Sequence, residues 1–147
     1  MTQPSLRPKD SRDSSSTLQP AHILFVEDSD SDIAYVKQTL RTGSPGYTYD
    51  IETAPTLLEA IRHINDNRYD LVMVDLNLLD INGLVVVSAL RAEAGETPII
   101  VYSGVNDRRW KEWALKYGVT SYLVKGYDEG SALAHTVERA LAKRAMN

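Results

Sequence analysis

Short strand-like runs that alternate with helical patterns limit most strongly what this chain can fold into. A continuous apolar run of four or five residues, bounded by polar turn residues, is typical of a strand buried on both faces of a parallel sheet. Strands are expected over residues 22–26, 49–53, 71–75, 99–102 and 121–124. Apolar residues at spacings of three and four predict helices over about 31–42, 56–67, 83–94, 106–117 and 129–143.

This alternation predicts an α/β fold. Five strand–helix units in succession form a doubly wound parallel sheet with right-handed crossovers. The 147 residues suit one domain with a sizeable core. Residues 1–21 carry much Ser, Pro, Arg and Asp and few large apolar groups, so we expect a disordered N-terminal tail there and one folded domain over 22–147.

Charge and composition exclude several classes of function. The net charge of −4 comes without a run of basic residues, which does not support binding to nucleic acid. No apolar stretch reaches the length of a membrane span or of a signal-peptide core, so we expect a cytoplasmic protein that has no membrane partner. The absence of cysteine excludes disulfides and cysteine-ligated metals.

Polar side chains stand at the carboxyl ends of four expected strands. Glu27 and Asp28 follow the first strand, Asp75 ends the third, Ser103 follows the fourth and Lys125 follows the fifth. The carboxyl ends of parallel strands share one edge of the sheet, which is where open α/β sheets bind ligands. These five side chains are therefore expected to meet in one crevice.

Helix capping does not explain the acids at this edge. Asp30 or Ser31 is the expected N-cap of the first helix, and Asp32 favours its first turn. That leaves the two acids directly after the first strand without a capping role. The acid at the end of the third strand lies about eight residues before the next helix, which is too far for a cap.

Three carboxylates against one ammonium leave about two excess negative charges in the crevice. At an effective dielectric near 20, each pair of like charges about 5 Å apart costs about 3 kcal/mol. A hard divalent cation with oxygen ligands would offset this repulsion, and Mg²⁺ prefers one or two carboxylates with water and a phosphate. Zinc is disfavoured because no His or Cys lies near these residues.

With a metal present, the remaining groups suit phosphoryl transfer. The Asp75 carboxylate can attack phosphorus and form an acyl phosphate when the charge on the transferring group is neutralised. The Lys125 ammonium and the Ser103 hydroxyl are the donors expected to hold phosphoryl oxygens. Gly104 leaves an opening for the phosphoryl donor. Taken singly, the lysine would be a surface residue and the serine a turn residue.

Four motifs together resemble the receiver domain of two-component response regulators. They are Val26-Glu27-Asp28-Ser29, Asp75 with Gly83 eight residues on, Tyr102-Ser103-Gly104, and Tyr122-Leu123-Val124-Lys125. The resemblance covers about residues 22–143. It implies a flavodoxin-like sheet of order 2-1-3-4-5 with five helices, and a phosphoprotein rather than an enzyme, which assists its own phosphorylation and dephosphorylation.

The resemblance also implies a role for each site residue. Asp75 is the expected phosphoacceptor from a sensor histidine kinase. The expected Mg²⁺ ligands are Asp28, Asp75 and the backbone carbonyl of Asn77, with Glu27 acting through water.

In the family, phosphorylation draws in the hydroxyl at the Ser103 position, and the aromatic at the Tyr122 position moves inward. A doubly charged phosphoryl group can reorient nearby donors, and a packed two-state element converts this into a changed surface for a downstream protein partner.

Two positions depart from the family pattern. Gly126 follows Lys125 where receivers usually have a proline in a cis peptide, so a trans bond or a rearranged loop is expected there. Leu79 also replaces a usual proline in the loop after Asp75. Neither change removes a group needed for phosphorylation.

Other functions fit the sequence less well. A flavin-binding protein would need neutral amides after the first strand, where this chain has acids. A phosphatase with an aspartate nucleophile would want an acid two residues beyond it, where the chain has Asn77. A phosphorelay shuttle to a histidine phosphotransfer protein, and a pseudo-receiver that binds without phosphorylation, remain as alternatives.

The output of the protein is expected to come through protein contacts. The chain ends shortly after its last helix, which favours a stand-alone regulator. Trp110, Trp113 and Tyr117 form an aromatic stripe on the fourth helix, suited either to core packing or to a partner or homodimer surface. The three histidines, His22, His63 and His135, lie apart in the sequence and form no motif.

Overall fold

Five parallel strands form one sheet in the order β2-β1-β3-β4-β5, as the family resemblance implied. The computed structural model describes residues 18–145, so most of the predicted N-terminal tail lies outside the described residues. The strands are β1 (Gln19–Val26), β2 (Tyr47–Ala54), β3 (Leu71–Val74), β4 (Ile99–Ser103) and β5 (Ser121–Val124). The helices are α1 (Asp30–Gly43), α2 (Leu57–Asp66), α3 (Val85–Ala94), α4 (Arg108–Lys116) and α5 (Ser131–Ala145).

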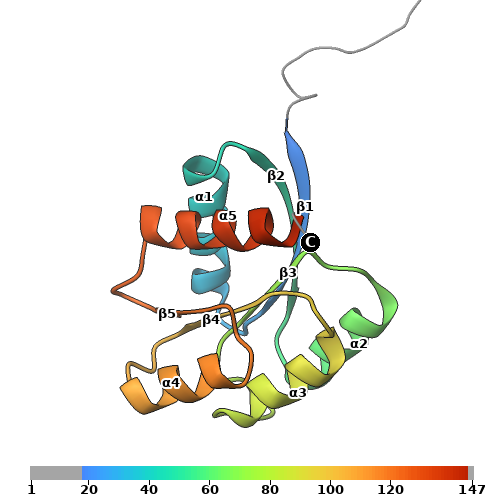
Figure 1. Cartoon of the computed structure of the whole chain (residues 1–147), viewed down its shortest axis with the longest axis vertical. Helices are drawn as coiled ribbons and strands as arrows, with labels where there is room; N and C mark the ends of the chain where they lie inside the picture. Colours follow the sequence, from blue (N-terminus) through green and yellow to red (C-terminus); the bar gives the residue numbers. More distant parts are fainter. Residues whose placement is uncertain (1–17, 146–147) are drawn as a thin grey trace, which may run out of the picture.

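Helices cover both faces of the sheet. Figure 1 shows α1 and α5 on one side and α2, α3 and α4 on the other. Side chains alternate along β1, so Ile23 and Phe25 pack in the cluster of α1 and α5, while Leu24 and Val26 pack in the opposite cluster. All four residues of β3 are buried, as expected for a central strand covered on both faces.

The first strand begins earlier than the sequence indicated. Residues 19–21, which were assigned to the tail, pair in parallel with Tyr47, Thr48 and Tyr49 of β2. Their register supplies backbone hydrogen bonds that do not depend on apolar side chains, which explains why the apolar pattern missed them. Among residues 18–145, no helix is long and apolar enough to cross a membrane.

The N-cap of α1 is Ser29, one residue before the position expected from the sequence. Its hydroxyl accepts the N–H of Asp32 at 3.3 Å. The expectation of Asp30 or Ser31 was wrong because both lie inside the first turn of the helix. This cap brings the first turn close to the end of β1 and places Asp32 near the carboxyl edge of the sheet.

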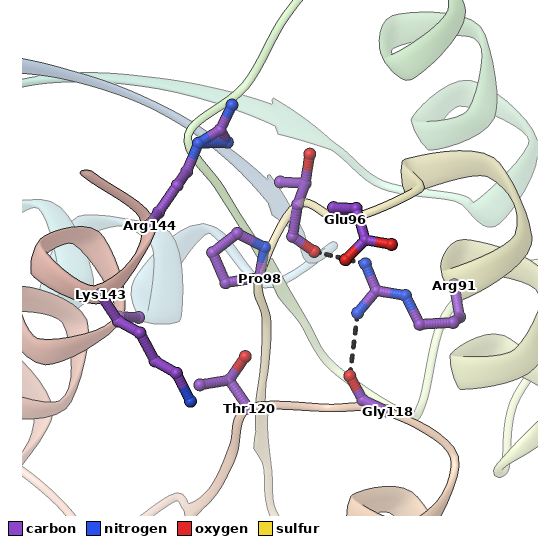
Figure 2. Close-up of a pocket in the computed structure, with 9 residues that line it drawn as sticks. Arg91, Glu96, Pro98, Gly118, Thr120, Lys143 and Arg144 are labelled. Atoms are coloured by element: carbon purple, nitrogen blue, oxygen red, sulfur yellow. Dashed lines mark hydrogen bonds between the residues drawn. The ribbon is translucent and has the colours of Figure 1, made fainter. Parts of the chain in front are cut away.

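At the amino end of the sheet, Arg91 of α3 ties the loop after α3 to the loop after α4. Its guanidinium donates to the carbonyls of Gly118 at 2.8 Å and Gly95 at 2.6 Å, and also to the carbonyl of Thr97. Figure 2 shows the guanidinium reaching Gly118 at the edge of a cavity of about 680 Å³. Gly118 has φ +103°, and a Cβ there would lie 2.9 Å from Cδ of Arg91.

Candidate functional site

The side chain of Lys125 stands at the centre of the carboxyl edge, between acids from three other segments. Its Nζ donates to Oε1 of Glu27 at 2.8 Å, to Oδ2 of Asp32 at 2.7 Å and to Oδ2 of Asp75 at 3.1 Å. Each of its three donors therefore faces a carboxylate. These contacts join three of the five side chains that the sequence placed at this edge, Glu27, Asp75 and Lys125.

Glu27 is the most buried acid of the site, with 1% of its surface exposed. Its second oxygen, Oε2, accepts the N–H groups of Asp28 at 3.1 Å and Ser29 at 3.2 Å. Burial, together with the charge of Asp75, raises the pKa of Glu27 to about 7, although the hydrogen bond from Lys125 acts to lower it. The site therefore holds more negative charge than its one lysine offsets.

Asp28 completes a cluster of acids at this edge. One carboxylate oxygen each from Glu27, Asp28 and Asp75 lies within 4.8 Å of the others. Oδ1 of Asp75 accepts the N–H of Asn77 at 3.2 Å, which fixes the carboxylate of an otherwise buried side chain. Three hard oxygen donors at this separation, with surplus negative charge, fit a divalent ion such as Mg²⁺.

Asp32 is a member of the site that sequence reasoning missed. Its carboxylate makes the shortest of the three contacts to Lys125. Burial alone would lower the pKa of Lys125, but its hydrogen bonds with Asp32 and Glu27 raise it above the usual range. The available signal was its place one turn into α1, directly after the acidic pair, which favoured a helix-dipole role instead.

Ser103 lies at the end of β4 with no exposed surface, and among the described residues its hydroxyl makes no hydrogen bond to Asp75. Its Oγ accepts the N–H of Val105 at 3.3 Å. Within residues 18–145, its O–H donates no hydrogen bond, so that donor remains available. Tyr122 is half-buried in β5 and donates from its hydroxyl to the carbonyl of Val105 at 2.8 Å.

The loop after Lys125 has its own internal support. Gly126 adopts φ +86°, and no cis peptide bond occurs in the described part of the chain, so the expected absence of a cis bond here is confirmed. The N–H of Gly126 donates to Oε2 of Glu129 at 2.8 Å, and the hydroxyl of Tyr102 donates to the same carboxylate at 3.0 Å. Glu129 therefore fixes the turn that a cis-proline usually shapes in receivers.

The loop after Asp75 is closed by backbone hydrogen bonds. The N–H of Gly83 donates to the carbonyl of Leu76 at 2.7 Å, and Asn77 pairs with Asn82 in an antiparallel bridge. Leu79, at the tip, is 71% exposed. The replacement of proline here leaves a closed loop with an apolar residue facing solvent.

The aromatic residues of α4 are divided between core and surface. Trp110 and Trp113 are each half-buried and pack against the core cluster of α2 and α3. The ring of Tyr117 lies 4.3 Å from that of Trp113, centroid to centroid, and 47% of Tyr117 is exposed. Core packing thus accounts for much of the stripe, while its carboxyl end faces solvent.

Comparison with protein families shows to which family this fold belongs. The family model of the response regulator receiver domain matches residues 23–137. The chain belongs to this family. The matched region contains every residue of the acidic site and both aromatic residues of β4 and β5 described above.

Known receivers resemble this receiver domain in sequence and in structure. The transcriptional regulatory protein PrrA of Mycobacterium tuberculosis is 31% identical over 120 residues, which are 82% of this chain and 48% of PrrA. The response regulator ArlR of Staphylococcus saprophyticus is 32% identical over 122 residues, 83% of this chain and 52% of ArlR. The chain therefore spans about half the length of these curated relatives.

Solved structures show the same fold. The chemotaxis response regulator CheY4 of Vibrio cholerae superposes with a TM-score of 0.70 and 30% identity, over 84% of this chain and 100% of CheY4. A CheY-like receiver domain protein from Methanospirillum hungatei gives a TM-score of 0.74 at 21% identity, over 88% of this chain and 98% of that one. The flavodoxin-like fold expected from the resemblance is confirmed.

Proposed function

We propose that this receiver domain accepts a phosphoryl group on Asp75 from a sensor histidine kinase and passes the signal to a protein partner. The supporting observation is the position of the Asp75 carboxylate, which ends a buried strand and lies 3.1 Å from the Lys125 ammonium. In the reaction, a carboxylate oxygen of Asp75 bonds to phosphorus as the bond from phosphorus to the donor breaks. The donor keeps the electron pair of the broken bond.

Lys125 supplies the positive charge that the transfer needs. Its ammonium contacts Asp75 before the reaction and is within reach of an oxygen of the group that becomes attached there. Donors aimed at developing charge in a site closed to water are among the largest contributions to catalysis. Asp32 and Glu27 hold the ammonium in place from the other side, so both act as positioning residues.

The acidic cluster fits a magnesium ion as cofactor. Asp28, Asp75 and the backbone carbonyl of Asn77 are the proposed ligands, with Glu27 acting through water. When bound, Mg²⁺ would neutralise part of the charge of the phosphoryl group. Glu27 and Asp75 serve Lys125 as well, so the site couples the ammonium to the metal through shared carboxylates.

Ser103 and Tyr122 are the proposed switch residues. The free O–H of Ser103 is a donor for a phosphoryl oxygen, and its use would draw the hydroxyl away from Val105. The hydroxyl of Tyr122 donates to the carbonyl of Val105. A movement of Ser103 that shifts Val105 would therefore also shift the hydrogen-bond partner of Tyr122 in β5. The altered surface beside β5 and α4 then offers the contact for a downstream protein.

Acetyl phosphate tests the proposal without the cognate kinase. Incubation with Mg²⁺ should add one phosphoryl group to the protein, measured by intact mass spectrometry, and chelation of the metal should prevent it. Asp75→Asn should remove the mass gain completely because the nucleophile is lost. Asp30→Asn is the matched control, since Asp30 lies in the same acidic region but its side chain is exposed.

Phosphorylation of Asp75→Asn to the same extent as the unaltered protein would overturn the assignment of the phosphoacceptor. A complete lack of phosphorylation in the folded, magnesium-loaded protein would favour the pseudo-receiver alternative instead.

A further inference from the structure

A second group of potential metal ligands lies away from the acidic edge, where β1 pairs with β2. His22 of β1 is in register with Asp50 of β2, and Glu52 follows two residues later on the same face. The Nε2 of His22 lies 3.1 Å from Oε2 of Glu52 and 3.7 Å from Oδ2 of Asp50. One nitrogen and two oxygens from adjacent strands therefore converge on one point.

The hydrogen bonding of His22 leaves this nitrogen open to a cation. The other ring nitrogen, Nδ1, lies 2.8 Å from the backbone carbonyl of Arg68. A carbonyl can only accept, so Nδ1 carries the hydrogen, and in the neutral ring Nε2 presents its lone pair to the carboxylates. Two groups that can only accept then face each other, and this arrangement needs either a proton or a metal ion between them.

Glu52 is oriented from behind by two further side chains. The hydroxyl of Tyr69 donates to its Oε1, and Nδ1 of His63 lies 3.4 Å from the same oxygen. The hydrogen bond from Tyr69 lowers the pKa of Glu52, so the carboxylate is ionised at neutral pH. One oxygen is thus held by the protein while the other faces His22, which is how carboxylate ligands of metals are commonly supported.

The separations suit a small tetrahedral ion. Ligand atoms at about 2.1 Å from zinc in tetrahedral geometry stand about 3.4 Å apart. The measured separations of 3.1 and 3.7 Å lie on either side of that value, and all three ligand atoms are within 4.8 Å of one another. An imidazole in the set, with its other nitrogen bonded to a carbonyl, favours zinc over the oxygen-seeking Mg²⁺.

We propose that His22, Asp50 and Glu52 form a second metal site, selective for a zinc-like divalent ion, that joins β1 to the edge strand β2. Three protein ligands leave a fourth position for water, and the exposed side chain of Asp50, 76% accessible, gives the ion a path of entry. The ion would replace the proton between His22 and Glu52 and fix the pairing of the two strands.

Calorimetric titration of the full chain with zinc chloride, in excess Mg²⁺ to saturate the acidic site, tests this proposal. One zinc ion per chain should bind, and His22→Gln should abolish the binding. Tyr69→Phe should weaken zinc binding about 10- to 100-fold, because the Tyr69 hydroxyl orients Glu52 but is not itself a ligand. His135→Gln is the matched control, since His135 is exposed on α5 and belongs to no cluster of metal ligands within residues 18–145. This variant should bind zinc as the unaltered protein does.

Nitrogen NMR of the imidazoles in the unaltered protein gives a readout that does not depend on any variant. Zinc should shift the Nε2 resonance of His22 strongly while Nδ1 keeps its hydrogen. The proposal fails if zinc leaves the Nε2 resonance unmoved, because His22 and Glu52 then form an ion pair only. Equal loss of binding in His22→Gln and His135→Gln would also overturn it, since this would show unspecific surface binding.

Discussion

The two ends of the sheet differ in how their charged side chains are paired. At the amino end, Arg91 donates to neutral backbone carbonyls, and Arg144 donates to the carbonyl of Tyr69 at 3.0 Å and lies 4.0 Å from a carboxylate oxygen of Asp70. At the carboxyl end, three acids contact the ammonium of Lys125, and a fourth, Asp28, has a carboxylate oxygen within 4.8 Å of those of Glu27 and Asp75. The loops of the first end are closed by partners inside the protein, while those of the second hold charge that the protein leaves without a counterpart.

From this difference we expect the amino end of the sheet to contribute mainly to stability and the carboxyl end mainly to function. A cation bonded to carbonyls ties loops together and needs nothing from solution. A surplus of buried carboxylates costs free energy until a cation or a phosphoryl group with its metal arrives. Substitutions at the amino end should therefore act on unfolding, and substitutions at the carboxyl end on phosphorylation.

The largest effect should follow from Lys125→Met, which keeps the apolar stem and removes the charge. The initial rate of phosphorylation by acetyl phosphate should fall about 100- to 1,000-fold, because one donor to the developing charge is lost. Lys116→Met, at an exposed position of α4, is the control and should keep the original rate. If a folded Lys125→Met protein were phosphorylated at the original rate, the proposal that the carboxyl end of the sheet serves phosphorylation would be wrong.

The pH dependence of stability should report the raised pKa of Glu27. Because the folded protein binds this proton more tightly than the unfolded chain, the free energy of unfolding should fall as pH rises from about 4.5 to about 7, and then level off. The fall should be at most about 3 kcal/mol. Urea unfolding without metal, at a series of pH values, measures it.

Glu27→Gln serves as the control for this slope, since the amide does not titrate. The unaltered protein in saturating Mg²⁺ should also lose most of the slope, because a metal beside Glu27 favours its charged form. A slope that is the same in Glu27→Gln would mean that other groups cause it.

A smaller effect is expected at the amino end from Arg91→Met. Loss of the hydrogen bonds to three carbonyls should lower the free energy of unfolding by about 2 kcal/mol, with the phosphorylation rate unchanged. Arg62→Met, at an exposed position on α2, is the matched control and should leave both quantities as they are. If Arg91→Met slowed phosphorylation as much as Lys125→Met, the proposed separation of the two ends would be wrong.

The sequence predicted the sheet because its signals there are redundant. Buried strands appear as apolar runs, and their ends in a parallel sheet share one edge, so the meeting of Glu27, Asp75 and Lys125 followed from topology alone. The order of the strands came from the family resemblance, and the structure confirms it.

What the sequence could not show depends on side-chain directions and on pairing between distant residues. Asp32 was read as a helix-dipole acid because its contact to Lys125 spans 93 positions. The cluster of His22 and Glu52 depends on the register of β1 with β2, which no local pattern fixes. The hydrogen bond of the Ser103 hydroxyl to Val105 is made within the loop that follows β4.

The main chain of Val105 connects the two proposed switch residues. Its N–H is held by one proposed switch residue and its carbonyl by the other, so a single residue serves as relay between the interior of β4 and the surface of β5. Information about phosphorylation need not travel through the packed core. It can pass along one short stretch of main chain, which leaves the rest of the sheet free to remain rigid.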